Sequence, residues 1–389
     1  MSARIAIAGA GLSGAVLARQ LAENSAHCIV VFDERSHIGG NCHTERDPAT
    51  GILLHTYGPH IFHTDREDIW RYVGRFAEFM PFLNRVKAVT PRGVFPIPVN
   101  LLTLNQFFGR TFNPAEARAF LATRCDRGAG EARNFEELAL QQFGRELYET
   151  FFYGYTKKQW GCEPRDLPAS ILARMPLRFN YDDAYYNSRF QGIPRDGYTP
   201  LIRAILDHPS IELRLGESLT RAARGDFHHL FFSGPIDAWF QHSLGRLRYR
   251  TVHFQRLEGE GDLQGNPVLN YTDENVPYTR VHEHKHFAPW EQHQRSVAFQ
   301  EFSKATEAGD SPYYPVRLLD DKKLFSSYRN LAAEEKGVSF LGRLGTYRYL
   351  NMDQVIAEAL DFSRETLQAW SDNRPAPSFP HAMGNSVLS

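Results

Sequence analysis

The chain begins with a short apolar run, Ile5-Ala6-Ile7-Ala8, which is typical of a strand buried in a parallel sheet. The segment Gly9-Ala10-Gly11-Leu12-Ser13-Gly14 follows, and apolar residues then recur at helical spacing as far as Leu21. A second apolar run, Ile29-Val30-Val31-Phe32, ends at Asp33. A strand, a glycine turn, a helix, a strand and an acid in this order predict a dinucleotide-binding unit. The glycines would admit the pyrophosphate, and the acid would meet the ribose.

The middle of the chain changes from a helical pattern to a strand pattern. From Leu101 to about Met175 apolar residues fall at helical spacing, and Asn113 and Asn134 each precede a helix start with an acid three residues on. Residues 85–99 have the pattern of a hairpin. Further on, we expect strands at residues 212–215, 228–232, 247–257, 268–271, 278–283 and 296–302.

The order of these patterns predicts an α/β fold in which a Rossmann-like domain is interrupted by other units. A last apolar run at residues 338–341 precedes Asn351 and Gln354, which have capping-box spacing. We assign residues 1–84, 205–243 and 318–370 to a dinucleotide-binding α/β domain, 100–175 to an inserted helical bundle, and 85–99, 176–204 and 244–317 to an antiparallel β-sheet domain. Residues 371–389 are rich in Pro, Ser and Asn, and we expect a disordered tail there.

Composition narrows the function. A formal net charge of −1 provides no global field that would attract nucleic acid. The four cysteines show neither zinc-ligand spacing nor a disulfide framework. No apolar run reaches membrane-spanning length, and no signal-peptide pattern precedes the first strand, so we expect a cytoplasmic protein without membrane insertion.

The loop after the second strand bears on the kind of dinucleotide. Gly39-Gly40-Asn41 lies beyond Asp33, and a further glycine pair suits FAD, which extends further along the sheet than NAD. A glycine pair also marks ordinary surface turns. Together with the first motif, it favours FAD.

Histidines gather in two places. His55, His60 and His63 could bind a metal, fill a buried loop or lie against the cofactor, and we favour the cofactor because no acid or cysteine has ligand spacing beside them. His282, His284 and His286 alternate as on one face of a strand. Arg280 would share that face and repel a cation, so we interpret them as polar packing and expect no metal site.

Aromatic and basic residues suggest a second ligand. Phe151 and Tyr155, four residues apart on a helix, could stack on a planar ring, although a packed helix end explains them equally well. Arginine forks and tyrosine hydroxyls both bind diphosphate oxygens. Such residues are scattered downstream: Arg174, Tyr185, Arg280, Tyr314, Arg343, Tyr347 and Tyr349. If the fold brings them together, they would form a nucleotide-diphosphate site.

Several longer blocks resemble prokaryotic UDP-galactopyranose mutases across residues 1 to about 365. The blocks are the N-terminal glycine motif and residues 55–63, 154–161, 190–194, 234–237, 275–280 and 342–344. The resemblance implies a flavin-dependent isomerase that interconverts UDP-galactopyranose and UDP-galactofuranose without net redox change, supplying galactofuranose for glycan biosynthesis. It implies reduced FAD, a covalent adduct between flavin N5 and the sugar, an external reductant such as NAD(P)H, and a homo-oligomer. The alternative that shares the N-terminal motif is an FAD-dependent oxidoreductase of the amine oxidase type.

The resemblance also assigns residues by position. For the substrate it implies Asn84, Phe151, Tyr155, Thr156, Trp160, Tyr185, Asn270, Arg280, Tyr314 and Tyr349. Arg174 and Arg280 would stabilise the diphosphate electrostatically. For the cofactor, motif and resemblance together give Gly9, Gly11, Ser13, Gly14, Asp33, Glu34, Gly40, Asn41, His60, Ile61, Arg343, Tyr349, Asn351, Met352 and Gln354. Asn351 departs from the family, which commonly has Asp there; a neutral amide would replace a carboxylate beside the diphosphate.

Overall fold

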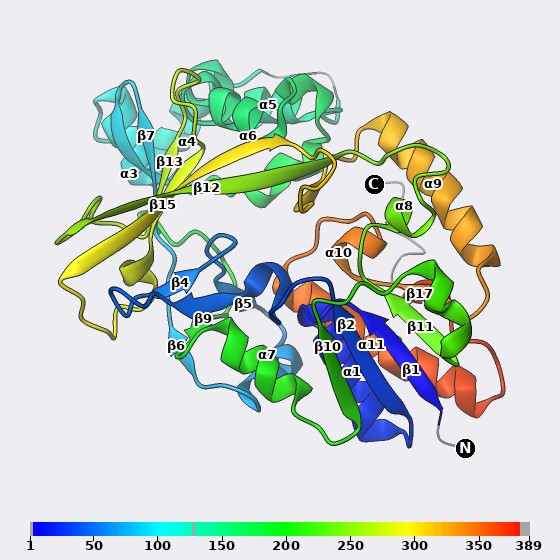
Figure 1. Ribbon diagram of the computed structural model, residues 1–389. Coiled ribbons are helices and arrows are strands. Elements are labelled where there is room, and N and C mark those ends of the chain that lie inside the picture. Colours follow the sequence, from blue (N-terminus) through cyan, green and yellow to red (C-terminus); the bar gives the residue numbers. More distant parts are fainter. Residues whose placement is uncertain (1–2, 127, 129, 382–389) are drawn as a thin grey trace.

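The computed structural model describes residues 3–126, 128 and 130–381. Two principal sheets organise the molecule, and smaller sheets lie between them (Figure 1). None of the helices in the described residues has a stretch long and apolar enough to cross a bilayer.

The N-terminal unit is a parallel sheet with strand order β10-β2-β1-β11-β17. Its strands are β1 (Arg4–Ala8), β2 (Cys28–Asp33), β10 (Ile211–Leu215), β11 (His229–Phe232) and β17 (Val338–Phe340). The order reverses between β1 and β11, as in doubly wound folds that bind a ligand at that point. The predicted Rossmann-like fold is therefore confirmed.

Both faces of this sheet are covered, which explains the unbroken apolar runs. Ile5 and Ile7 belong to one buried cluster with Leu17, whereas Ala6 and Phe32 belong to another. α1 packs against α11 and α7. The helices associated with the sheet are α1 (Leu12–Asn24), α7 (Tyr198–Leu206), α8 (Ile236–Trp239), α9 (Leu319–Glu334), α10 (Gly342–Gly345) and α11 (Met352–Ser371).

The second principal sheet has the order β16-β12-β15-β14-β13-β7-β8. Its strands are β7 (Val86–Thr90), β8 (Gly93–Ile97), β12 (Tyr249–Glu260), β13 (Val268–Tyr271), β14 (Arg280–Glu283), β15 (Arg295–Ala305) and β16 (Tyr314–Pro315). Neighbouring strands are antiparallel except β13 and β7, which are parallel. The sheet is thus mixed rather than purely antiparallel, since β13 joins the β7–β8 hairpin from a distant part of the chain.

Smaller elements lie between these sheets (Figure 1). They are β3 (Thr44–Arg46), β4 (Leu53–His55), β5 (Phe62–Thr64), β6 (Phe79–Pro81), β9 (Phe190–Pro194) and α2 (Glu67–Gly74). β9 pairs with β5 and β6. Our assignment of residues 176–204 to the larger sheet is therefore wrong for β9 and for the start of α7, because backbone pairing and packing on α1 hold them beside the N-terminal unit.

Helices cover one end of the mixed sheet, as the helical pattern predicted (Figure 1). They are α3 (Leu101–Phe108), α4 (Pro114–Ala122), α5 (Phe135–Leu147), the π-helical turn η2 (Tyr148–Tyr153) and α6 (Gly154–Trp160). Asn113 and Asn134 cap α4 and α5, and Asn351 and Gln354 form the capping box of α11. The predicted helix starts are therefore confirmed. They could be predicted from the sequence because capping depends only on residues a few positions apart.

The expected disordered tail is wrong as far as residue 381. Phe340 N donates to Ser378 O at 2.8 Å, Ser339 Oγ donates to Pro377 O at 2.6 Å, and Phe379 stacks on Phe340 with ring centroids 5.6 Å apart. The polar composition of this segment gives no indication of these hydrogen bonds to β17. Residues 382–389 of the expected tail lie outside the described residues.

The expected alternation of histidines along one strand is also wrong. β14 ends at Glu283, and residues 284–287 form a 3-10 turn, η6 (His284–Phe287). His284 is fully buried, and its Nδ1 accepts a hydrogen bond from His55 N at 3.2 Å. Their rings stack at 6.2 Å. Burial lowers the pKa of His284 to about 3 and that of His55 well below its usual value.

These buried neutral histidines predict acid sensitivity. The unfolded chain takes up a proton at each histidine near pH 6.5, whereas folded His284 takes one up only near pH 3. Unfolding therefore binds protons in this window, and each such histidine lowers the free energy of unfolding by about 1.4 kcal/mol per pH unit as the pH falls. The free energy of unfolding, measured with urea at several pH values, should therefore depend less steeply on pH in His284→Gln, by about one proton taken up on unfolding. An unchanged slope of this free energy against pH would contradict the prediction.

Candidate functional site

A first cavity, of about 510 Å³, opens where the strand order reverses. Gly9, which follows β1, and Ser233 and Gly234, which follow β11, lie in its wall. The N-terminus of α1 meets the same cavity, and the described residues provide no side-chain cap for it. A helix N-terminus whose N–H groups face a cavity suits a phosphate.

The glycine turn is shaped by close packing. A Cβ on Gly14 would lie 1.9 Å from Gly9 O, and a Cβ on Gly9, whose φ is +107°, would lie 2.2 Å from Ser233 Oγ. Gly11 is different, since its nearest neighbour, Gly40 Cα, would be 3.7 Å away. Gly9 and Gly14 are thus required by the packing of the fold. Gly11 is not, and its missing side chain leaves room in the cavity for a ligand to approach the backbone.

Most residues predicted for the cofactor line this cavity: Gly9, Gly11, Ser13, Gly14, Asp33, Glu34, Gly40, Asn41, His60, Arg343 and Met352. Ile61 instead packs in the core, Asn351 and Gln354 cap α11, and Tyr349 lines a second cavity. The sequence prediction missed Cys42, which follows Asn41, and wall residues from distant segments, among them Leu219, Thr220, Arg221, Trp239 and Tyr313.

The structure defines the hydrogen bonds of Asp33 and the protonation state of His60, two polar side chains of the cavity wall. Asp33 Oδ2 accepts from Ala10 N at 2.8 Å, and its Oδ1 accepts from Arg35 N at 3.0 Å, so the acid also ties β2 to the glycine turn. His60 Nδ1 lies 2.8 Å from Gly58 O. Burial lowers the pKa of His60 to about 4, and Arg343 and Arg280 act in the same direction. His60 is therefore a neutral imidazole at the cavity wall.

A second cavity, of about 250 Å³, lies between α6 and the mixed sheet. Nine residues predicted for the substrate line it: Phe151, Tyr155, Thr156, Trp160, Tyr185, Asn270, Arg280, Tyr314 and Tyr349. They come from helix, loop and strand positions up to about two hundred residues apart, and the fold brings them together. Phe152, Gln159, Met175 and Thr272, which were not assigned, also line it.

A buried carboxylate that sequence analysis missed holds Arg280. Glu301, 1% exposed, faces Arg280 across the β14–β15 pair and accepts from its Nη2 at 2.7 Å with both oxygens. Burial opposes the charge of Arg280, but Glu301 outweighs it, so the pKa of Arg280 lies well above its usual value. The guanidinium is thereby charged and fixed in orientation.

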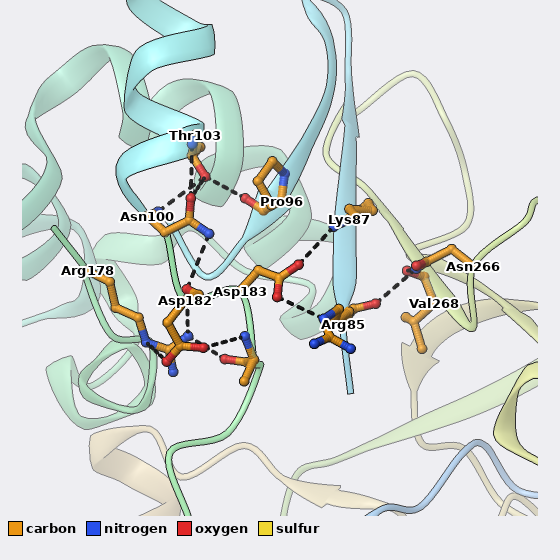
Figure 2. A network of polar contacts seen from close by, with 11 residues as sticks. Arg85, Lys87, Pro96, Asn100, Thr103, Arg178, Asp182, Asp183, Asn266 and Val268 are labelled. Carbon is orange, nitrogen blue, oxygen red and sulfur yellow. Dashed lines mark hydrogen bonds and ion pairs between the residues drawn. The ribbon is translucent and has the colours of Figure 1, made fainter. Parts of the chain in front are cut away.

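Tyr185 reaches the cavity on a loop that is anchored to β7. Figure 2 shows Asp183 facing Arg85 and Lys87, with ion pairs of 2.9 and 3.4 Å. Tyr185 N donates to Asn84 O at 2.8 Å. Asn84 is buried and does not line either cavity, so its described contact positions Tyr185 through the backbone.

A cluster around Arg343 joins the two cavities. Arg343 lines the first cavity, and its guanidinium lies 5.6 Å and 5.0 Å from the ring centroids of Tyr314 and Tyr349, which line the second. These tyrosine rings stack at 5.7 Å. Burial raises the pKa of Tyr314 to about 12, so its hydroxyl stays neutral. Ligands in the two cavities would meet here.

Arg174 ends the 3-10 turn η4 (Ala169–Arg174), and its side chain lies outside the described part of the structure.

Within the described residues, Asp262, Glu283 and His286 bring ligand atoms within 4.8 Å of one another. Lys285 Nζ lies 2.5 Å from Asp262 Oδ1 and already neutralises that carboxylate, so we assign no metal to this cluster.

The fold and the cavities define a Rossmann-type dinucleotide-binding protein with an adjoining aromatic and basic site for a second ligand. A family model described as UDP-galactopyranose mutase matches residues 150–349, and a model for an NAD(P)-binding Rossmann-like domain matches residues 7–76. The chain belongs to the UDP-galactopyranose mutase family.

Relatives and a solved structure agree with this family. A probable UDP-galactopyranose mutase of Klebsiella pneumoniae is 51% identical over 375 residues, covering 96% of this chain and 97% of the relative. A dTDP-fucopyranose mutase of Escherichia coli is 49% identical over 365 residues, covering 92% and 97%. A crystal structure of reduced UDP-galactopyranose mutase matches with a TM-score of 0.75 over 98% of this chain and all of the other; at 14% identity it supports the fold alone.

The glycine turn gives a prediction that separates folding from binding. Gly14→Ala should destabilise the protein strongly, because its Cβ would collide with Gly9 O. Gly11→Ala should fold with nearly the wild-type melting temperature but retain less dinucleotide, because only the cavity loses room. Thermal unfolding and chromatography of the nucleotide released by heat measure both effects. Equal dinucleotide retention by Gly11→Ala and wild type would contradict the assignment.

Proposed function

We propose that this protein is a pyranose–furanose mutase acting on UDP-galactose, and that it uses reduced FAD without net redox change. The observation that carries the proposal is the contact between the two cavities at Arg343, Tyr314 and Tyr349. A dinucleotide in the first cavity and a nucleotide sugar in the second would place a redox ring beside a sugar diphosphate. The similarity to mutases over nearly the whole chain supports the same reaction.

FAD fits the first cavity on three grounds. The cavity has a volume of about 510 Å³ and extends from the glycine turn to the Gly39–Cys42 segment. It also reaches the N-terminus of α1, which no side chain of the described residues caps. Gly11, Asp33 and Asn41 would hold its pyrophosphate and ribose, and His60 and Arg343 would lie toward the second cavity. When bound and reduced, a flavin supplies a nucleophilic nitrogen for the anomeric carbon of the sugar.

The chain's own residues bind and orient the substrate. Tyr155 and Trp160 would stack on the base and ribose, while Gln159 Oε1 and Asn270 Oδ1, buried and unpartnered among the described residues, would accept hydrogen bonds from the ligand. The fixed Arg280 would donate to the diphosphate, whose negative charge grows as it leaves the sugar. Arg174 would provide a second cation there.

The test is turnover of UDP-galactofuranose, followed by chromatography, with dithionite and without it. Arg280→Ala should lose roughly a hundredfold or more in kcat/KM, since a charge-assisted partner of a leaving group contributes about 2–4 kcal/mol. Arg295→Ala is the control, because Arg295 lies on the neighbouring strand and pairs with Glu258 at the surface. Wild-type turnover by Arg280→Ala, or oxygen consumption in place of isomerisation, would overturn the proposal.

The near-equal identity to a dTDP-fucopyranose mutase favours one second candidate substrate, dTDP-fucopyranose. A thymidine nucleotide lacks the ribose 2′-hydroxyl. Asn270 Oδ1 is buried and has no partner in the described part of the chain, and a 2′-hydroxyl would satisfy it. We therefore favour the uridine nucleotide. Asn270→Ala should weaken UDP binding about tenfold and leave dTDP binding unchanged in titration calorimetry; the reverse pattern would favour dTDP-fucopyranose.

The same proposal includes an external reductant such as NAD(P)H, a cytoplasmic location and a homo-oligomer. A reductant is needed because the flavin must be reduced before the first turnover and is not reduced by the substrate.

A further inference from the structure

Lys158 belongs to α6 but does not line the cavity that its helix neighbours line. Its ammonium enters the turn between β13 and β14. There Nζ lies 2.8 Å from the carbonyl oxygens of Tyr271 and Asp273, 2.9 Å from that of Val276 and 3.0 Å from that of Tyr278. We name these carbonyls the oxygen cage.

An oxygen cage of this kind needs a cation. Carbonyl dipoles that point at one spot repel one another, and a buried carbonyl without a donor costs free energy. An ammonium has three N–H donors and a positive charge, so it can donate to three of the four carbonyls at a time, while its charge attracts all four carbonyl dipoles. Rings of backbone carbonyls hold K⁺ in the same way, by replacing its hydration shell.

The oxygen cage joins both sides of the second cavity. The turn connects Asn270 on β13 to Arg280 on β14, which are paired in register. On the other side, α6 carries Tyr155 and Trp160. The helix lies so close to the turn that a Cβ on Gly154 would approach Thr272 O to 2.3 Å.

The neighbouring Lys157 provides a contrast. Its Nζ pairs with carboxylates at the surface, 3.1 Å from Glu163 Oε1 and 3.2 Å from Glu274 Oε1. Exposed pairs of this kind contribute little. Lys158 is the more buried of the two, and burial lowers its pKa to about 8 although Asp273 and Glu274 act in the opposite direction.

We propose that Lys158 is a positioning residue whose ammonium acts as a tethered monovalent cation, fixing the β13–β14 turn against α6 and thereby the width of the nucleotide cavity. The functional part rests on the proposed function, since it assumes that this cavity binds a nucleotide. Removing the side chain would leave a site for a free monovalent cation. Lys158→Ala should therefore respond to NH₄⁺ or K⁺, and the wild type should not.

Two measurements test this on the full-length protein, at constant ionic strength with choline chloride as the reference salt. In choline, Lys158→Ala should melt at a lower temperature than the wild type and bind UDP roughly 10- to 100-fold more weakly, because small misplacements of binding groups are costly. NH₄⁺ or K⁺ should restore much of both. The control Lys157→Ala should stay within about twofold of the wild type in every salt.

The outcomes separate the possibilities. Wild-type stability and affinity of Lys158→Ala in choline would overturn the proposal, and so would a loss that neither NH₄⁺ nor K⁺ reverses, because that loss would be purely structural. If Lys158→Ala does not fold, Lys158→Met keeps the buried stem; it should bind UDP weakly in every salt, and wild-type affinity would overturn the proposal. If the wild type itself does not bind UDP, the proposed function fails, while the salt-dependent melting temperature still tests the oxygen cage.

Discussion

The carboxylate of Glu358 holds the segment on which both cavities depend. From α11 it accepts a hydrogen bond from Gly342 N at 3.1 Å and pairs with Arg348, whose Nε donates to Thr346 Oγ1 at 3.0 Å. Glu358 is 7% exposed, so this pair is desolvated and contributes specificity of conformation more than net stability. The segment between β17 and α11 carries Arg343 to the first cavity and Tyr349 to the second. Its fixed shape includes Tyr347 at φ +48°, a conformation that an L-residue adopts only when its surroundings enforce it.

Chain order and capping signals were sufficient to predict most of the fold. The glycine turn, Asp33 and the capping residues Asn113, Asn134 and Asn351 act on neighbours within a few positions, so their roles can be inferred locally. The site was predicted less completely. Nine residues that were predicted to bind substrate line one cavity. Predicting that they converge depended on the resemblance to a family, because spacing along the chain does not encode which strands become neighbours.

The errors have the same origin. Glu301 was missed because it meets Arg280 through strand register, 21 residues away, and register was unknown. The assignments of Asn84 and Ile61 to ligands stay predictions; the described structure places Asn84 behind Tyr185 and Ile61 in the core. His284 was placed on a strand because alternation was extended past Glu283, where the chain turns into η6. The residues after α11 were expected to be disordered because amino-acid composition carries no information about hydrogen bonds to a distant strand such as β17.

The two arginines near the place where the cavities meet, Arg280 and Arg343, differ in their partners. Glu301 neutralises Arg280, so this arginine contributes fixed donors more than net charge. Arg343 differs: its described contacts are the carbonyls of Leu350 and Tyr313 and two tyrosine rings, and none of these is a carboxylate. Burial keeps the hydroxyls of Tyr155 and Tyr314 neutral by raising their pKa values. In the proposed reaction the diphosphate must leave the sugar and then return. An arginine whose charge is balanced, as Arg280 is by Glu301, suits that cycle, because overly tight binding of the departed diphosphate would raise the barrier to its return.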